Sequence, residues 1–332
     1  MKRLFLKTVA AAVALGALGL AHAQTRTIKF ANQNAKGTPI VMGMEKFAEL
    51  VEKNSNGRLK VQVFPGGALG SDQANVSALQ GGTLEMAAMN SGIFASVAKE
   101  FAVYDFPFLF ATPQEADAVV DGPFGQMMHK KLEAHGLVGL AYYELGFREL
   151  TNSKRPIHKV EDIAGLKLRV IPNPINVDWV SALGANPTPL PFPELYAALE
   201  QKAVDGQENP PSTIKGAKLY EVQKYMAMTN HQYNPQSVVV SKKFWDSLSA
   251  ADRKLLQDAA QASAKYEREQ SRSQLAATIA ELKKDGMEVT ELPPAEMAKL
   301  REKMKPVIAK HTPGVGEDTV KAILAEIDKV RK

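Results

Sequence analysis

Residues 165–172 read Gly-Leu-Lys-Leu-Arg-Val-Ile-Pro, and residues 204–210 read Val-Asp-Gly-Gln-Glu-Asn-Pro. The first stretch alternates apolar residues with Lys167 and Arg169, which is typical of a half-buried strand. An arginine in an apolar strand is costly to bury unless an anion meets it. On spacing alone, the strand could equally present Lys167 and Arg169 together on a solvated sheet face.

The chain around this strand alternates between strand and helix patterns. Helices are expected where a capping residue precedes an apolar period, as at Thr38-Pro39 and at Ser71. This alternation predicts an α/β fold with a mostly parallel sheet and helices on both faces. The predicted strands are 27–31, 59–63, 84–89, 138–143, 167–171, 203–207 and 237–240, and 192–202 reads as a helix.

A long segment without glycine or proline follows Ser249 and ends at Gly286. Ser249 and Asp252 form a pattern like a capping box at its start. A single helix over this segment would be roughly 54 Å long at about 1.5 Å per residue, enough to cross two lobes. The alternative is two helices with a bend near Arg272.

Composition narrows the class of protein. The 332 residues exceed one typical domain, so two lobes are expected. Lys and Arg number 41 against 36 Asp and Glu, and no basic cluster interleaved with aromatic residues suggests nucleic-acid binding. The absence of cysteine excludes disulfides, thiol nucleophiles, cysteine metal sites and a lipid-modified cysteine.

The N-terminus has the organisation of a secretory signal peptide. Lys2, Arg3 and Lys7 precede an apolar run over residues 8–20, and Ala21-His22-Ala23 is a small-x-small cleavage site. The apolar run is shorter than the ~20 residues that a membrane span needs. We therefore expect residues 1–23 to be removed and the mature protein to be exported.

Nothing in the sequence predicts catalysis, a metal or a cofactor. Gly-x-Ser-x-Gly, His-Glu-x-x-His and phosphate-loop motifs are absent. His129 and His135, beside Lys130, Lys131 and Glu133, are interpreted as a solvated helix surface. The sequence therefore favours a binding protein over an enzyme.

Several polar and aromatic residues are ambiguous when considered alone. Arg148, in Gly-Phe-Arg, could serve a site or pair with Glu149 on the surface. Asn209 precedes two prolines, where asparagine is common for conformational reasons. Phe192 and Trp179 are typical of a core as much as of a ligand platform.

Five motifs in order resemble the substrate-binding proteins of tripartite ATP-independent periplasmic (TRAP) transporters, the DctP-like group. The resemblance extends over essentially the whole chain after residue 23. The motifs are Phe-Pro-Gly-Gly-Ala-Leu-Gly at 64–70, Gly-Phe-Arg-Glu-Leu-Thr-Asn at 146–152, Gly-Leu-Lys-Leu-Arg-Val at 165–170, Leu-Gly-Ala-Asn-Pro-Thr-Pro at 183–189 and Ala-Val-Asp-Gly-Gln-Glu-Asn-Pro at 203–210.

The resemblance implies a two-lobed periplasmic-binding-protein fold, with a central mixed sheet in each lobe and a long helix spanning both. We expect lobe I to comprise 24–145 plus 235–274, and lobe II to comprise 146–234 plus 275–332. The resemblance also implies that Arg169 makes a two-pronged salt bridge to a ligand carboxylate. It further implies that Arg148 assists and that Asn209 lines the same site. The planar guanidinium fork suits this task.

The resemblance also points to the ligand class. Approximate alignment puts Asn90 and Ile93 where sialate binders carry a Glu and an Arg, which argues against sialate. Amides suit the hydroxyl groups of a sugar acid, such as a hexuronate or an aldonate, because both can donate and accept. The expected pocket adds the amides Gln33, Gln73, Asn90 and Asn173, with Trp179 or Phe192 over an apolar sugar face.

Two alternatives remain open at this stage. The ligand could be a C4-dicarboxylate or another small hydroxy or keto acid, or the protein could report its ligand to a membrane sensor kinase. For transport, the resemblance implies the small and large membrane subunits of a TRAP permease as partners. We expect a periplasmic monomer that binds a small organic acid and no nucleic acid.

Overall fold

The computed structural model describes residues 25–331, so the predicted signal peptide lies outside the described residues. Its centre is one nine-stranded mixed sheet with the order β2-β1-β3-β8-β4-β7-β5-β6, and β9 pairs with β8. The strands are β1 Arg26–Ala31, β2 Leu59–Phe64, β3 Met86–Asn90, β4 Leu137–Asn152, β5 Lys167–Val170, β6 Asn186–Pro189, β7 Gly206–Asn209, β8 Tyr225–Ser241 and β9 Glu288–Glu291.

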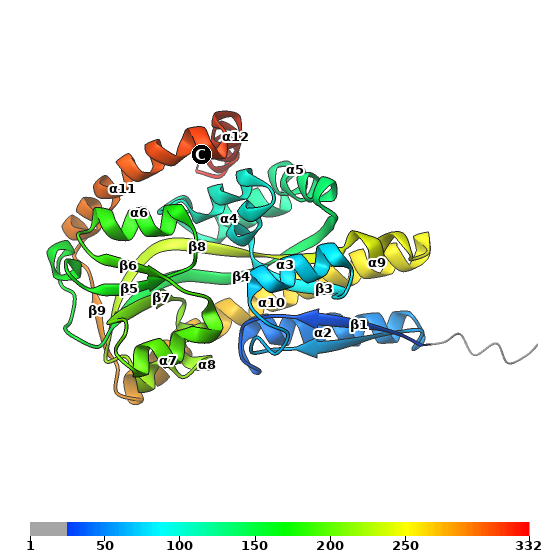
Figure 1. Cartoon of the computed structure of the whole chain (residues 1–332), viewed down its shortest axis with the longest axis horizontal. Coiled ribbons are helices and arrows are strands. Elements are labelled where there is room, and N and C mark those ends of the chain that lie inside the picture. Colours follow the sequence, from blue (N-terminus) through cyan, green and yellow to red (C-terminus); the bar gives the residue numbers. More distant parts are fainter. Residues whose placement is uncertain (1–24, 332) are drawn as a thin grey trace, which may run out of the picture.

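Helices cover both faces of this sheet (Figure 1). The α-helices are α2 Pro39–Asn54, α3 Asp72–Gly81, α4 Pro113–Asp121, α5 Pro123–Leu132, α6 Pro174–Ala182, α7 Leu195–Glu200, α8 Pro211–Gly216, α9 Lys242–Asp246, α10 Ala250–Lys284, α11 Pro294–Val315 and α12 Glu317–Val330. The 3-10 turns are η1 Ser91–Ser96, η2 Lys99–Asp105, η3 Glu133–His135, η4 Val160–Ile163, η5 Phe192–Glu194 and η6 Leu219–Glu221.

The strands β4 and β8 run through both halves of the molecule and join them. Sequence patterns revealed only part of each strand, because their central residues carry polar side chains. The antiparallel register between them shifts between Glu144 and Gly146, opposite Pro235 and Asn234. Gly146 has φ +104°, which a side chain would strain. This irregularity lies next to positions 145/146 and 234/235, where the lobe boundaries are expected.

Lobe I has an apolar core on each face of its sheet. Val238 and Val240 of β8 face α2 and the first half of α10, whereas Val239 faces η2, α4 and α5. This alternation is the period-two pattern of a strand buried on both sides. Met44 and Phe47 fill the first core from α2, at the helical spacing that the sequence predicts.

Lobe II has the same layering, with a core on each face of its part of the sheet. Leu168 and Val170 of β5 pack with α6 and α11 on one face. On the other face, α7, α8 and the end of α10 enclose a core that includes Leu199 and Leu282. Figure 1 shows β5, α6, α7 and α8 at the left, β1 and α2 at the lower right, and β4 and β8 between them.

The helix α10 is continuous, which settles the open alternative of two helices. The hydroxyl of Ser249 accepts a hydrogen bond from the backbone N–H of Asp252 at 3.0 Å and caps it as predicted. Leu256 packs in the core of lobe I and Leu282 in that of lobe II, so the helix spans both lobes.

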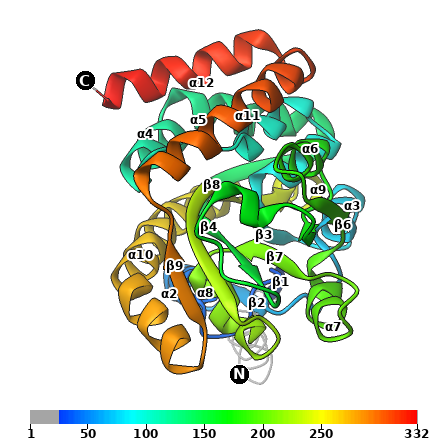
Figure 2. The same ribbon diagram turned by 90° about the vertical axis from the view of Figure 1, so that its left-hand side faces the viewer.

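The last helix, α12, departs from the predicted lobe assignment, whereas α11 follows it. The helix α11 packs on α6 of lobe II, whereas Val320, Ile323 and Ile327 of α12 join the core formed by α4 and α5 of lobe I. Figure 2 shows α11 and α12 following one another over α4, α5 and α6. Residues 317–330 therefore pack with lobe I, contrary to the expectation that 275–332 belong to lobe II.

The interpretation of His129 as a solvated residue is wrong. Its ring stacks on Tyr142 with centroids 3.9 Å apart, and its Nε2 is 3.2 Å from the hydroxyl of Ser237. Burial lowers the pKa of His129 to about 3. Neighbouring lysines suggested an exposed face, but His129 lies on the opposite side of α5, against Gly139.

Candidate functional site

A cavity lies between the two lobes, where β1, β3, β5 and β7 end. Its volume is about 50 Å³, room for about four water molecules at ~10–15 Å³ each. Its walls carry polar side chains and a few apolar ones. They are Asn32, Gln33, Asn34, Asp72, Gln73, Asn90, Ile93, Leu145, Arg148, Arg169, Ile171, Pro172, Pro191, Phe192, Asn209, Thr213 and Gln236.

Arg169 reaches the cavity from β5 and is only 2% exposed. Its Nε donates to the carbonyl of Leu190 at 2.8 Å, and its Cζ lies 5.8 Å from the centre of the Phe192 ring. Its Nη1 is buried and has no hydrogen-bond partner among the described residues. Lys167 is exposed, so the interpretation of one solvated face carrying both residues is wrong.

The guanidinium of Arg169 remains cationic at neutral pH. Burial lowers the pKa of Arg169 to about 10, although Glu208 opposes that shift. A buried cation with an unused donor is unfavourable until an anion or acceptor meets it. Binding of a carboxylate would therefore neutralise the buried cation of Arg169 and satisfy its unused donor.

Arg148 already has protein partners. It is 1% exposed, its Nη2 donates to Glu208 Oε1 at 2.9 Å, and its Nη1 donates to Asn234 Oδ1 at 2.8 Å. Burial alone would raise the pKa of Glu208, but Arg148 holds it at about 2. The interpretation of a surface pair with Glu149 is wrong, since Glu149 Oε2 accepts from the backbone N–H of Thr229 at 2.6 Å.

Four cavity-lining side chains each hold a buried polar atom that has no hydrogen-bond partner within residues 25–331. The atoms are Gln33 Oε1, Asp72 Oδ1, Asn90 Nδ2 and Arg169 Nη1. Because an unsatisfied buried polar group costs about 1–3 kcal/mol, four at one place mark a surface prepared for a polar ligand. Donors and acceptors are both represented, as a hydroxylated ligand requires.

The structure brings seven of the nine predicted site residues together. Those seven line the cavity: Gln33, Gln73, Asn90, Arg148, Arg169, Phe192 and Asn209. Trp179 does not, because its Nε1 donates to Asn176 at 3.1 Å and its ring packs on His231. Asn173 caps α6 and donates to Asp105, so it lies behind the cavity wall.

Sequence reasoning missed Asn32, Asn34, Asp72, Thr213 and Gln236. Asp72 follows Ser71, which caps α3, and it therefore resembles an ordinary acidic residue of a first helical turn. Burial raises the pKa of Asp72 to about 7, although Arg169 opposes that shift. The position of Asn32 and Asn34, directly after β1, was a usable signal because ligands gather at the carboxyl ends of such strands.

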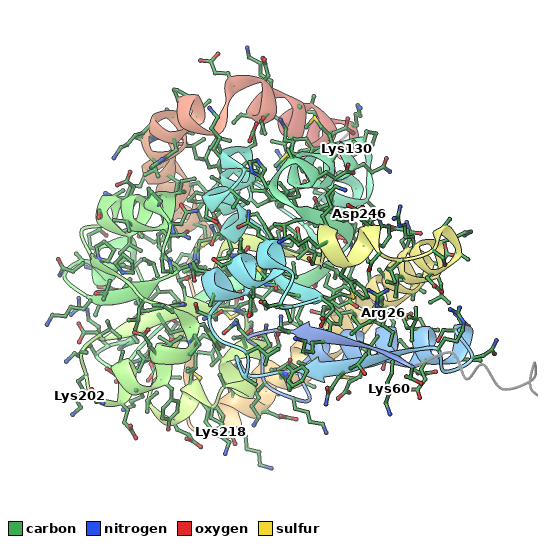
Figure 3. All side chains as sticks on the ribbon, turned by 45° about the vertical axis from the view of Figure 1, so that its right-hand side comes forward. Arg26, Lys60, Lys130, Lys202, Lys218 and Asp246 are labelled. Atoms are coloured by element: carbon green, nitrogen blue, oxygen red, sulfur yellow. The ribbon has the colours of Figure 1, made fainter. Side chains whose placement is uncertain are left out.

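Other kinds of site find no support in the described part of the chain. No group of three or more His, Asp or Glu residues between 25 and 331 could hold a metal ion. None of the helices described is both long and apolar enough to cross a membrane. The lysines labelled in Figure 3 lie far apart in the chain: Lys60 in β2, Lys130 in α5 and Lys202 in the turn after α7.

Two lobes that enclose a polar cavity with one unsatisfied arginine define a two-lobed binding protein for a small solute. Residues 30–313 match the family described as bacterial extracellular solute-binding protein, family 7 (DctP). The chain belongs to this family of TRAP solute-binding proteins. Its members are periplasmic binding components that work with TRAP membrane subunits in transport, rather than enzymes.

Two solved structures and one curated relative illustrate this kinship. A TRAP periplasmic solute-binding protein from Ochrobactrum anthropi, with its C-terminus bound in the ligand-binding pocket, is 53% identical with a TM-score of 0.83, over 93% of this chain and 97% of that one. The sugar acid binding protein DctPAm from Advenella mimigardefordensis, in complex with galactonate, is 41% identical with a TM-score of 0.90, over 92% and 99%. The C4-dicarboxylate-binding periplasmic protein DctP of Rhodobacter capsulatus is 35% identical over 92% of each chain.

Proposed function

We propose that this protein captures a sugar acid, an aldonate or a hexuronate, through a salt bridge between the ligand carboxylate and Arg169. The observation that carries the proposal is the buried Nη1 of Arg169, which has no partner among residues 25–331. Leu190 occupies Nε, so the ligand would approach the Nη edge of the guanidinium. The captured acid would then pass to the membrane subunits of a TRAP permease.

Charge around the cavity favours one carboxylate over two. Arg148 is neutralised by Glu208, so it is a poor anchor for a second anion. The other ionisable group in the wall is Asp72, which would repel an anion when it is ionised and can accept a bond from a hydroxyl group. A second carboxylate buried here would lack a cation, which is expensive.

The amides of the wall favour hydroxyl groups elsewhere on the ligand. Gln33 Oε1 offers an acceptor and Asn90 Nδ2 offers a donor, and a hydroxyl group can satisfy either. The galactonate complex of a 41% identical relative supports the same class.

Titration calorimetry against a panel of acids tests the proposal. The panel is gluconate, galactonate, gulonate, glucuronate, galacturonate, succinate, malate and sialate, with wild-type protein and Arg169→Ala. Lys167→Ala is the matched control, because Lys167 lies on the same strand but is exposed. We expect tight binding of one sugar acid, weakened only by Arg169→Ala. Tight binding of succinate or malate, with no sugar acid bound, would show instead a C4-dicarboxylate binder.

A further inference from the structure

A second carboxyl group lies directly behind the cavity, between its two walls. Asp105 is the last residue of η2, is fully buried, and does not line the cavity. Its Oδ2 accepts a hydrogen bond of 2.7 Å from Asn173 Nδ2. Asn173 directly follows the cavity residue Pro172 and caps α6.

Asp105 also supports the wall on the lobe I side. A Cβ atom built on Gly92 would lie 2.0 Å from Asp105 Oδ2, so the carboxyl group packs directly on the Gly92 backbone. The N–H of Gly92 donates to Asn90 Oδ1 at 3.2 Å and thereby orients the Asn90 amide, which faces the cavity. One carboxyl group therefore contacts the backbone that fixes Asn90 and the side chain that caps α6.

The chain around Asp105 passes from one core to the other. Phe106 packs in the core of lobe I, whereas Phe108 packs against that of lobe II. The backbone is held on both sides of this crossing: Gln232 Nε2 donates to the carbonyl of Asp105 at 2.5 Å, and the N–H of Phe108 donates to the carbonyl of His231 at 2.8 Å. These hydrogen bonds therefore anchor the backbone at Asp105, where the chain crosses from one lobe to the other.

Asp105 does not form a simple ion pair with the charged side chains near it. Burial raises the pKa of Asp105 to about 7, although Arg148 opposes that shift, and Arg148 is itself engaged by Glu208. The Asn90 side chain also opposes the shift, so it lies close to the Asp105 carboxyl group. Asp105 Oδ2 can accept the hydrogen bond from Asn173 whether the carboxyl group is ionised or protonated. The contact therefore requires an acceptor at residue 105 and does not require a charge.

From these contacts we propose that Asp105 is a positioning residue of the binding site. It holds the wall at Asn90 and the wall at Asn173 in register when the lobes are closed, and it does not touch the ligand. The proposal rests on the proposed function, since it concerns affinity for the acid captured at Arg169.

Three variants separate positioning from simple support of the fold. Asp105→Ala removes the acceptor, Asp105→Asn keeps an acceptor of the same shape, and Asn173→Ala removes the donor. We expect Asp105→Ala to weaken binding of the acid on the order of tenfold or more, and Asp105→Asn to bind within about threefold of wild type. Asn173→Ala also removes the Oδ1 that caps α6, so it can lose more than Asp105→Ala. Because both alanine variants break the Asp105–Asn173 contact, the loss in the double variant should be smaller than the sum of the two single losses.

A second readout does not depend on any ligand. Hydrogen exchange at the first amides of α6, measured without acid, should be faster in Asp105→Ala than in wild type or Asp105→Asn. If no acid binds wild type, the proposed function fails and this comparison still decides the role of Asp105. Wild-type affinity in Asp105→Ala, additive losses in the double variant, or unchanged exchange at α6 would each overturn the inference.

Discussion

Replacing Arg169 should abolish tight binding without destabilising the unliganded protein. Arg169 is 2% exposed and its Nη1 has no partner among the described residues, so the folded protein bears the cost of a poorly satisfied buried cation. A desolvated carboxylate would relieve that cost. Truncating one partner of such a pair costs roughly 2–5 kcal/mol, which is about 30-fold or more in the dissociation constant.

Arg169→Met and Arg169→Lys distinguish charge from geometry. Met fills a similar volume without charge, whereas Lys keeps the charge but loses the planar fork. We expect calorimetry to show at least about 30-fold weaker binding for Arg169→Met and at least about tenfold for Arg169→Lys. Thermal unfolding without ligand should give Arg169→Met a midpoint equal to or above that of wild type.

Two results would refute this reasoning. Wild-type affinity in Arg169→Lys would mean that a point charge suffices and that no fork geometry is used. A large loss of unliganded stability in Arg169→Met would mean that Arg169 is a structural ion partner, so that weaker binding reflects a damaged fold. Lys167→Met, on the exposed side of β5, should change neither quantity.

Three further predictions concern the buried polar groups and the lobes. Glu208→Gln should lower the free energy of unfolding by roughly 3–5 kcal/mol in chemical denaturation, because it leaves Arg148 buried without its counter-ion; a change below about 1 kcal/mol would contradict the pairing. Because the pKa of His129 is lowered to about 3, its contribution to stability is complete above its ordinary value of about 6.5 and is lost as pH falls from there toward 3. His129→Phe should therefore show a shallower loss of stability from pH 6.5 to 4.5 than wild type or His135→Gln, and parallel curves would contradict the shift. Small-angle scattering should give a smaller radius of gyration with ligand than without, and identical curves at saturation would argue against closure.

The fold was predictable from the sequence where local patterns are strong. Ser249 and the glycine-free segment after it predicted α10, and the structure confirms one continuous helix. The packing of α12 was not predictable from the sequence. Its apolar face could pack on either lobe, and only the tertiary structure shows that it packs on lobe I. The crossing strands β4 and β8 were also underestimated, since polar residues interrupt their alternation where they pass the cavity.

The site was predictable only in part, for physical reasons that differ between residues. The alternating pattern could not predict that Arg169 is buried while Lys167 is exposed. That difference arises because the segment with Leu190 and Phe192 contacts Arg169 in the folded protein. Trp179 was expected over an apolar sugar face from approximate alignment, yet its indole N–H is bonded to Asn176 inside lobe II. Asp72 was missed because its local setting is that of an ordinary helix start.

A crystal structure of the protein with its bound acid tests the central claim most directly. We expect one ligand carboxylate about 2.7–2.9 Å from the Nη edge of Arg169, with hydroxyl groups bonded to Gln33 and Asn90. Arg148 should remain paired with Glu208 in the complex. A ligand carboxylate bound elsewhere, with Arg169 Nη1 still lacking an acceptor, would contradict the account.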